Sequence, residues 1–579
     1  MTLTQRGAAP ATSIPDEVVD EVELDRVVRA VAAKATEWAH TTPAHRRALL
    51  SDVIAATVEE APAWLASACA AKGLPLGTTE SGEELFSGVG TFVTMAQAYI
   101  TSLTDLERSG RPHYPGPVTP TGDGRVTVRV FPRTSLEKLL FAGTTAEVWM
   151  EPGLTEPAIQ HAQARAYRDP DGSKGTALVL GAGNVASLGP RDVLSKLIGE
   201  GKVVVLKANP VNAYLVPHWR KAMAPLIDAG YLAIVDGGAK VGAYLCDHPA
   251  IDEIHVTGSD KTYDAIVYGV GEDGAKRKAA DTPLRTTPVS AELGSVSPVI
   301  VVPGNWSAKD ISYQAEHVAT MLTNNAGFNC LTPRVIITHA AWPQREAFMA
   351  ALEATLAKIP TRPAYYPGAG DRFKAFVDAH PDADQIGEVS GAKLPWTVIR
   401  GVQPAATGDI CLNVEAFCSL TSECALDATD AASFVTEAVR FANEVVWGSL
   451  SATVLCHPKQ LKDPVVGTAV RKGIADLRYG GIGLNLFHGL VFALSTPTWG
   501  AYPGHARNDI QSGVGVVGNA YMLEGTEKSV ITGPWIQRPA PVWFATQKNS
   551  SAVMEALLSY QAKPSLGTAV KVLTAAIRA

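Results

Sequence analysis

The feature that most constrains the fold of this chain is a change in the sequence pattern near residue 175, where short runs of β-branched residues begin to alternate with helical segments. Glycine or small polar residues follow most of these runs, and stretches such as PRDVLSKLIGEG separate them. Strands that alternate with helices at this spacing are typical of parallel βαβ units with both faces of the sheet covered. The pattern predicts an α/β fold with two sheets, one before about Ala291 and one after it. The runs are TALVLGAG, KVVVLKAN, YLAIVDGG and EIHVTGS in the first set, and SPVIVVP, PRVIITH, LSATVLCHP and GGIGLNLF in the second.

The flanking regions have other patterns. From about Glu17 to Leu106, apolar residues recur at three- and four-residue spacing, which predicts helices. A Gly/Pro-rich break follows, and then RVTVRVF and TAEVWM predict two exposed strands of a hairpin. The C-terminal stretch from about residue 550 predicts two amphipathic helices that pack rather than catalyse. With 579 residues, the chain is long enough for two or three domains.

Composition excludes several classes of partner. The net charge is −7, from 50 basic and 57 acidic residues, and no basic block tracks a phosphate backbone, so we expect no nucleic acid. The longest apolar runs are strand-sized, and the first residues carry no apolar core segment, so we expect neither a membrane span nor a secretory signal. Seven cysteines form an odd, sparse set without metal-ligand pairing. They predict reduced thiols, a cytoplasmic location and no metal site.

Small and polar residues follow the strands of the first set. Gly183 ends TALVLGAG and Asn184 follows it; glycine there lets a ligand approach the backbone, and the Asn184 amide could point at a reacting oxygen. A tight turn would explain the glycines equally well. Lys207 ends the next strand; it is either solvated or bonded to a ribose. Thr257, Gly258 and Ser259 close the fourth strand, where a cofactor could lie.

Two further residues could carry chemistry. Glu292 precedes a glycine and a strand, and it is either a solvated loop residue or a general base. Cys330 lies in TNNAGFNCLTPR, among asparagines and a glycine, immediately before an apolar strand. A free cysteine is most often a small core residue, but this polar setting favours an accessible thiol.

The order and spacing of these motifs resemble the aldehyde dehydrogenase superfamily over roughly residues 175–510. Glycine-asparagine, lysine, Thr-Gly-Ser, Glu-Leu-Gly and cysteine follow one another as they do in that family. Later segments are similar to family motifs as well and give Glu415, Asn443, Asn485 and Trp499.

The resemblance implies a Rossmann-type cofactor domain, an α/β catalytic domain and a mechanism. Cys330 would be the nucleophile, Asn184 and the Cys330 backbone N–H would hold the oxyanion, and Glu292 would activate water. Lys207 and Glu415 would hold the two cofactor riboses. The expected reaction is oxidation of an aldehyde to a carboxylic acid through a thiohemiacetal and a thioester, with NAD or NADP as cofactor.

This sequence departs from the family pattern in several places. The acid that usually ends the Pro-Ser-Glu run after the lysine is absent from Lys207-Ala208-Asn209-Pro210, which leaves NADP as plausible as NAD. The glycine expected after Thr-Gly-Ser is missing, an insertion-like segment follows, and Glu415 lacks its usual neighbours. Three alternatives stay open: a coenzyme-A-acylating aldehyde dehydrogenase or acyl-CoA reductase, a catalytically silent dinucleotide-binding relative, and a plain reductase in which Cys330 is core. Acylating members generally lack the glutamate, so Glu292 favours hydrolysis.

The predicted domains are 1–291 (helical region and cofactor domain, with an arm at about 125–171), 292–515 (catalytic thiol domain) and 516–579 (C-terminal arm or tail). By resemblance, the arm predicts a homodimer or a dimer of dimers. Trp499, Phe487, Phe492 and Tyr502 suggest an aromatic tunnel and hence a hydrophobic aldehyde.

Overall fold

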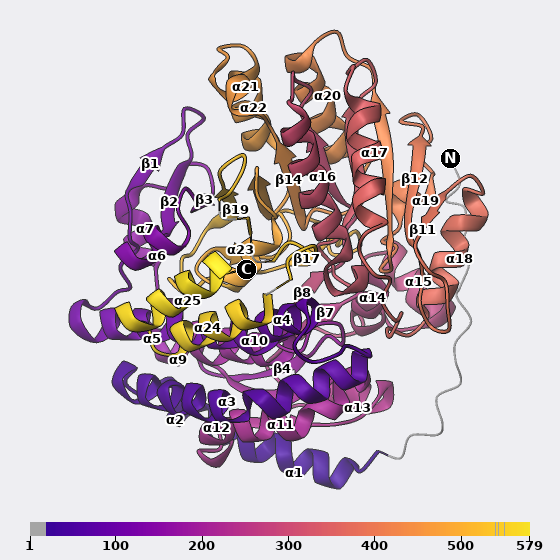
Figure 1. Ribbon diagram of the computed structural model, residues 1–579. Coiled ribbons are helices and arrows are strands. Elements are labelled where there is room, and N and C mark those ends of the chain that lie inside the picture. Colours follow the sequence, from indigo (N-terminus) through magenta and orange to yellow (C-terminus); the bar gives the residue numbers. More distant parts are fainter. Residues whose placement is uncertain (1–18, 539, 542, 549, 579) are drawn as a thin grey trace.

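The four strands predicted first form the core of a six-stranded sheet, in the order β17-β8-β7-β4-β5-β6. The computed structural model describes residues 19–538, 540–541, 543–548 and 550–578 (Figure 1). The central strands are parallel and nearly all of their residues are buried, as the β-branched runs predict. Their bounds are β4 (Thr176–Leu180), β5 (Val203–Lys207), β6 (Leu232–Val235), β7 (Glu253–Gly258), β8 (Val289–Leu293) and the short antiparallel β17 (Gly513–Val514).

The strand order of this sheet contains a topological switch point, where the chain changes the side on which it adds strands. From β4 the chain adds β5 and β6 on one side and then places β7 on the other side of β4. Ligands of open parallel sheets bind outside the carboxyl ends of the strands at such a switch point. The strand order therefore predicts a ligand site beyond the ends of β4, β5 and β7.

Helices cover this sheet, and the predicted N-terminal helical region is confirmed. It consists of α1 (Glu21–Ala32), α2 (Ala35–Ala39), α3 (Pro43–Lys72), α4 (Thr79–Leu85), the π-helical turn η1 (Phe86–Gly90) and α5 (Thr91–Ser109). The helices between the strands are α10 (Leu188–Leu194), η2 (Ser195–Gly199), η3 (Pro210–Leu215), α11 (Val216–Ala222), α12 (Ala224–Asp228), α13 (Ala239–Cys246), α14 (Asp260–Tyr268) and α15 (Gly271–Ala279).

The second sheet has eleven strands, in the order β1-β2-β3-β19-β15-β14-β9-β10-β13-β12-β11. Its parallel core is β9 (Ser297–Val301), β10 (Pro333–His339), β12 (Trp396–Val402), β13 (Leu420–Leu426), β14 (Ser451–Leu455), β15 (Gly481–Leu484) and β19 (Thr526–Thr532); β11 (Asp384–Ile386) lies antiparallel at one edge. Its main helices are α16 (Ala308–Thr323), α17 (Arg345–Leu356), α18 (Ala369–Ala379), α20 (Ala431–Glu444), α22 (Val466–Asp476) and the short α23 (Gly489–Leu494). The boundary between the sheets falls after β8, so the strand that carries Glu292 belongs to the first sheet.

The predicted hairpin arm is present, but it is not exposed as expected. β2 (Val126–Phe131) and β3 (Thr145–Met150) pair with each other, and β1 (Val118–Pro120) adds to the edge. β3 also pairs with β19 of the same chain, and Val128, Val130, Val148 and Met150 are buried. An isolated two-stranded hairpin is marginal in water, so the chain stabilises its own arm by adding it to the catalytic sheet.

The two predicted C-terminal helices are α24 (Ser550–Ala562) and α25 (Leu566–Arg578), drawn in yellow beside α4 and α5 in Figure 1. At the crossing with α4, a Cβ atom added to Gly82 would lie 2.8 Å from the Ser551 backbone nitrogen. Only glycine allows this close approach of the two helices. The tail after residue 533 is thereby fixed onto the N-terminal helices.

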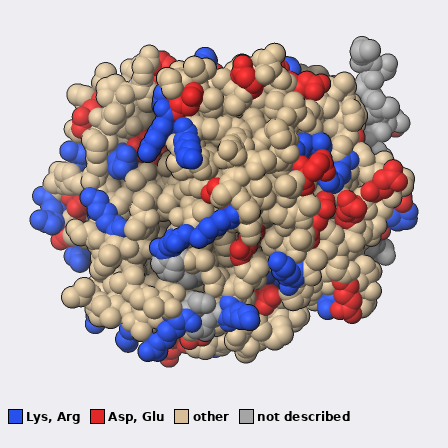
Figure 2. Space-filling view, turned by 45° about the horizontal axis from the view of Figure 1, so that its top comes forward, with Lys and Arg blue, Asp and Glu red and all other residues tan. Residues whose placement is uncertain are grey.

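On the face shown in Figure 2, acidic and basic side chains are interspersed. Among the described residues, no helix combines the length and the apolar character that a bilayer crossing requires.

Candidate active site

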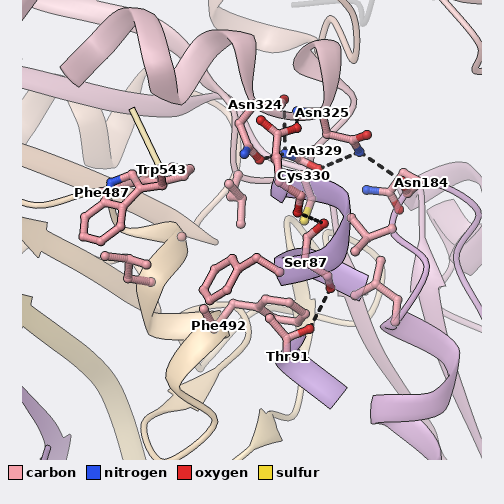
Figure 3. Close-up of a pocket in the computed structure, with 18 of the residues that line it drawn as sticks. Ser87, Thr91, Asn184, Asn324, Asn325, Asn329, Cys330, Phe487, Phe492 and Trp543 are labelled. Carbon is pink, nitrogen blue, oxygen red and sulfur yellow. Dashed lines mark hydrogen bonds between the residues drawn. The ribbon is translucent and has the colours of Figure 1, made fainter. Parts of the chain in front are cut away.

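One pocket, of about 90 Å³, brings together residues from both sheets and both ends of the chain (Figure 3). Cys330, Glu292 and Asn184 all line it, although they lie far apart in the sequence. In Figure 3, Asn184 lies on one side of Cys330, and the rings of Phe487 and Phe492 lie on the other. The remaining lining residues are Thr79, Glu83, Phe86, Ser87, Thr91, Val185, Leu188, Thr320, Asn324, Asn325, Asn329, Leu331, Gly489, Leu490, Ala493, Trp499, Trp543, Ser550 and Met554.

The loop before Cys330 has an uncommon backbone. Asn325, Ala326 and Gly327 all have positive φ (50°, 55° and 78°) in η4 (Asn324–Gly327). The left-handed conformation costs a non-glycine residue roughly 1–2 kcal/mol, so neighbouring contacts must hold it. Arg334 supplies some of them, because its guanidinium donates to the carbonyls of Gly327 (2.5 Å) and Cys418 (2.6 Å). This turn presents Cys330 to the pocket just before β10.

The Cys330 thiol is uncharged at rest. Burial raises the pKa of this thiol well above its ordinary value, and the nearby carboxyls of Glu292 and Glu415 raise it further. Its own backbone N–H opposes them to a smaller extent. A thiol reacts as a nucleophile in its thiolate form, so a thiol with a raised pKa can do so only with a base beside it.

Glu292 is placed to be that base. It is a buried strand residue of β8 rather than a solvated loop residue, and among the described residues its Oε1 atom has no hydrogen-bond partner. Burial raises the pKa of Glu292 to about 8; contact with Cys330 lowers it, and the charges of Asp192 and Glu415 raise it further. A carboxyl that titrates near neutral pH can take a proton from a thiol or from water.

Asn184 lies four residues beyond the end of β4 and is buried. Its side-chain Nδ2 atom donates to the Phe328 carbonyl at 2.9 Å, which ties it to the cysteine loop. An amide nitrogen has a second N–H, and in this pocket that hydrogen can serve an oxyanion on a substrate bound to Cys330.

Four of the predicted cofactor residues, Lys207, Thr257, Gly258 and Ser259, lie at the carboxyl ends of β5 and β7, but they differ in exposure and contacts. Lys207 ends β5 and is buried, whereas Gly258 at the end of β7 is exposed. Ser259 caps α14 by accepting from the Thr262 backbone N–H at 3.2 Å. The hydroxyl of Thr257 donates to Asp192 at 2.9 Å, so this side chain serves the helix packed on the sheet.

Gly183 and Glu415 also have specific surroundings. A Cβ atom at Gly183 would lie 2.7 Å from Asn209 Oδ1, so only glycine fits there. Glu415 packs against Gly294, and its Oε1 atom has no hydrogen-bond partner. Burial raises the pKa of Glu415 to about 7, while the Arg334 charge opposes this.

Of the other landmarks, Trp499, Phe487 and Phe492 line the pocket as expected. Tyr502 does not: its ring lies 5.7 Å from the Lys528 ammonium, a cation–π contact away from the pocket. Asn443 bonds to the backbone of Asp476 and Arg478, and Asn485 bonds to the backbone of Cys456, so both hold the chain in place.

Residues outside the recognised motifs form much of the pocket wall. Phe86 and Ser87 belong to η1, and π-helical turns are frequent at functional sites. Trp543 and Met554 come from the C-terminal tail, which the sequence predicted only to pack. Nothing in their local sequence indicates a pocket, because the close approach of α24 to α4 places them there.

A group of potential metal ligands occurs elsewhere, at His380, Asp409 and Cys411, whose ligand atoms lie within 4.8 Å of one another. Asp409 already caps the helical turn α19 (Ile410–Asn413) by accepting from the Cys411 N–H at 2.8 Å, and it bonds to His380 at 3.1 Å. These bonds explain the cluster without an ion.

Comparison with known proteins supports the resemblance. The aldehyde dehydrogenase family model matches residues 184–368. A coniferyl aldehyde dehydrogenase from a Pseudomonas species is 26% identical over 274 residues, which cover 44% of this chain and 52% of that protein. A probable aldehyde dehydrogenase from Streptomyces coelicolor is 26% identical over 359 residues, which cover 57% and 62%. The chain thus spans less than two thirds of the curated relatives it matches.

Solved structures extend the likeness of the fold to nearly the whole chain. An NADP-dependent glyceraldehyde-3-phosphate dehydrogenase from Bacillus halodurans, complexed with NADP, superposes with a TM-score of 0.59 at 16% identity, over 88% of this chain and 91% of that one. An aldehyde dehydrogenase from Pseudomonas syringae, complexed with NAD+ and octanal, gives 0.58 at 18% identity, over 90% of each chain. The family-model match over residues 184–368 and the curated relatives support membership of the aldehyde dehydrogenase superfamily, and the solved structures show that the chain has the fold of its members.

Proposed function

We propose that this protein oxidises an aldehyde to a carboxylic acid with NAD or NADP as hydride acceptor. The observation that supports this most is the convergence of Cys330, Glu292 and Asn184 on one pocket. A thiol, a titratable carboxyl and an amide donor are the groups that the chemistry needs. The likeness to aldehyde dehydrogenases adds independent support.

The residues around the switch point fit a dinucleotide. The chain approaches this predicted ligand site through Gly183 and Gly258, and Lys207 can donate to a ribose hydroxyl. The unpartnered Oε1 atom of Glu415 leaves an acceptor for the second ribose. When bound there, the nicotinamide would supply the acceptor for the hydride that leaves the substrate carbon.

The chain's own residues carry the proton and acyl chemistry. Glu292 removes the proton from the Cys330 thiol, and the thiolate attacks the aldehyde carbonyl. Asn184 and the Cys330 backbone N–H then hold the oxyanion of the thiohemiacetal. After oxidation to the thioester, Glu292 gives the thiol proton up to solvent, and its carboxylate then takes a proton from the water that attacks the acyl carbon. The C–S bond breaks, the acid leaves, and the Cys330 thiolate takes the proton back from Glu292.

Both nicotinamide dinucleotides stay open as cofactors. Pro210 occupies the place where the family commonly has a carboxylate, and the side chain of Asn209 before it accepts from the Val211 N–H at 3.0 Å. An uncharged side chain there does not repel a 2′-phosphate, so NADP fits as well as NAD.

The pocket favours an uncharged, apolar aldehyde. Aromatic and aliphatic side chains, including Phe487, Phe492 and Met554, line much of it. Among the described lining residues, none is Lys, Arg or His, so a phosphate or carboxylate on the substrate would lack a cationic partner.

Glu292 also bears on the main alternative, transfer of the acyl group to coenzyme A. That transfer needs no water-activating base, so a buried carboxyl beside the thiol favours water as the acceptor. A catalytically silent dinucleotide-binding protein is the remaining alternative, and the intact set of catalytic side chains disfavours it.

We further propose a cytoplasmic location, which the seven free thiols support. A homodimer or a dimer of dimers stays a prediction from the resemblance. The pairing of β3 with β19 removes one reason for it, since the arm needs no partner chain to cover it.

The test is turnover on a panel of aliphatic, aromatic and anionic aldehydes, with NAD and NADP separately and with and without coenzyme A. We expect reduced nicotinamide without coenzyme A and loss of activity in Cys330→Ala. In Glu292→Gln we expect a slowed first turnover, because the thiol has lost its base, and then a stall, because water has lost it too. Turnover that needs coenzyme A would reassign the protein to the acylating branch. Dinucleotide binding without any turnover would support the silent alternative.

A further inference from the structure

A buried ion pair from the N-terminal helices reaches the back of the active site. Lys72 is the last residue of α3 and Glu84 belongs to α4; their Nζ and Oε2 atoms lie 2.7 Å apart, and both side chains are almost fully buried. Two charges are costly to bury, even as a pair. This pair is of interest because it lies behind the residues of the candidate active site, and not because it stabilises the fold.

The Lys72 ammonium also bonds to the catalytic loops. It donates to the backbone carbonyl of Asn184 at 3.2 Å and to the side-chain oxygen of Asn325 at 3.1 Å. Asn325 in turn donates from its side chain to the same Asn184 carbonyl at 2.9 Å and to the Phe328 carbonyl at 3.1 Å. One lysine therefore connects the loop of the oxyanion asparagine with the loop of the cysteine.

Tyr365 completes the group. Its hydroxyl oxygen lies 2.8 Å from the Asn184 carbonyl oxygen and 2.9 Å from the Asn325 side-chain oxygen, so its one hydrogen can be donated to either or shared between them. Three donors thus meet at one carbonyl oxygen, that of Asn184. A single donor would satisfy that carbonyl, so the additional bonds serve to fix its position.

The neighbouring acid braces the other side of the same loop. Glu83 accepts the Asn325 backbone N–H at 2.7 Å and is held by Arg362 at 2.9 Å. Asn325 is the first of the residues with positive φ before Cys330. Two successive glutamates of α4 therefore support this strained turn, one directly and one through Lys72.

We propose that the buried Lys72–Glu84 pair is a positioning device for the oxyanion hole: it fixes the Asn184 main chain so that its side-chain amide faces the Cys330 adduct. This rests on the oxyanion role of Asn184 in the proposed function. The ammonium also lies beside the Asn184 peptide group, where its charge favours negative charge developing in the pocket. Glu84 compensates that charge when the pocket is empty.

The test replaces the pair with apolar residues of similar size, as Lys72→Met/Glu84→Leu. Replacing both partners avoids an unpaired buried charge and is often neutral for stability. We expect the single-turnover rate of nicotinamide reduction to fall about ten- to a hundred-fold, a share of the loss that deleting a whole oxyanion donor causes. The aldehyde KM and the affinity for the cofactor should change by less than about two-fold, because a positioning residue acts on the transition state.

Asn184→Ala decides whether the effect passes through the asparagine. It should lose on the order of a hundred-fold alone, and adding Lys72→Met/Glu84→Leu should lower the rate little further, since groups that act as a unit are not additive. Full additivity would overturn the proposal, and so would a wild-type rate in the pair variant. An unchanged rate in Asn184→Ala would instead remove the oxyanion role itself.

Two further variants separate positioning from folding. Tyr365→Phe keeps the ring and removes one of the donors, so we expect a fall of a few-fold at an unchanged melting temperature; this test stands even if the pair variant does not fold. Lys528→Met is the matched control: this lysine is also buried and donates to backbone carbonyls, of Ile474, Ala475 and Leu477, but it does not line the pocket. It should lower stability and leave the single-turnover rate within about two-fold. A loss of rate in Lys528→Met equal to that in the pair variant would reduce the Lys72 effect to a general consequence of losing a buried lysine.

Discussion

Glu292 predicts a steep dependence of activity on pH. Its pKa is about 8, mainly because the carboxyl is buried. A carboxyl can accept the thiol proton only after losing its own, so the active form is lost as the pH falls through about 8. Each pH unit below that value should lower kcat/KM about ten-fold, which leaves about 1% of the plateau at pH 6.

The assay is kcat/KM for an apolar aldehyde between pH 5.5 and 9, at saturating dinucleotide, for wild type and Glu292→Gln. In wild type, the decline of kcat/KM below about pH 8 is the acidic limb of the profile. Glu292→Gln should lack this limb, and its kcat/KM at pH 8.5 should be a hundred-fold or more below that of wild type, as is typical for loss of a general base. The reasoning would be refuted by a flat wild-type profile, or by the same limb in Glu292→Gln.

A neighbouring carboxyl provides an internal control. Asp192 is buried, burial raises its pKa to about 7, and its negative charge is among the causes that raise the pKa of Glu292. Asp192→Asn removes that charge, so the limb should move to lower pH while the plateau rate is kept. The other charged groups that act on Glu292 and Asp192 are Arg191, Lys196 and Glu415. Because such sites titrate together, the limb reports an apparent pKa of the group. A limb that moves upward in Asp192→Asn would contradict this electrostatic account.

Three further predictions concern stability and specificity. Folding raises the pKa of Glu292 from 4.5 to about 8, so wild type loses up to about 1.4 kcal/mol of stability for each unit by which the pH rises across that window. In urea unfolding, Glu292→Gln should therefore be more stable than wild type at pH 7.5 but not at pH 4.5. Gly327→Ala forces a Cβ atom to 2.4 Å from the Cys418 carbonyl oxygen at a φ of +78°, so it should cost more than about 1 kcal/mol and most of the activity; a wild-type melting temperature would count against this. Trp543→Ala and Met554→Ala should raise KM about ten-fold for long or aromatic aldehydes and leave acetaldehyde turnover unchanged, since a buried apolar side chain contributes about 1.5–3 kcal/mol; equal effects on all aldehydes would argue against a tail-built wall.

Much of the sheet architecture could be predicted from the sequence. A strand that is buried on both faces, such as the one that contains VVVL, is apolar at every position, and this composition is visible in the sequence. Glu292 was harder to place. Its setting in VSAELGS fitted a solvated loop residue as well as a general base, and only pairing with β7 shows that it is buried on β8. The exposure of the arm was mispredicted for a related reason: the strand that covers it, β19, lies some 380 residues further along the chain.

Some residues of the candidate site could be predicted from the sequence and others could not. Cys330, Glu292 and Asn184 could be named because their residue types and order match a known chemistry. Lys72 and Glu84 could not, since a lysine at a helix end and a glutamate in TESGEEL read as solvated residues, and their burial depends on how α3, α4 and the cysteine loop pack. Local sequence carries no information about such a meeting of distant segments.

The resting site holds protons rather than charges, and this reconciles the raised pKa of the thiol with its role as nucleophile. Burial and the surrounding carboxyls keep Cys330 as a thiol and Glu292 largely as an acid at neutral pH. A neutral thiol reacts slowly with oxidants and alkylating agents, because these reactions also need the thiolate. The thiol should therefore resist iodoacetamide below pH 8 in the free enzyme, and its alkylation rate should rise along the same limb as kcat/KM. If alkylation were already fast at pH 6, Cys330 would be a standing thiolate, and the proton stored on Glu292 would have no part in activating it.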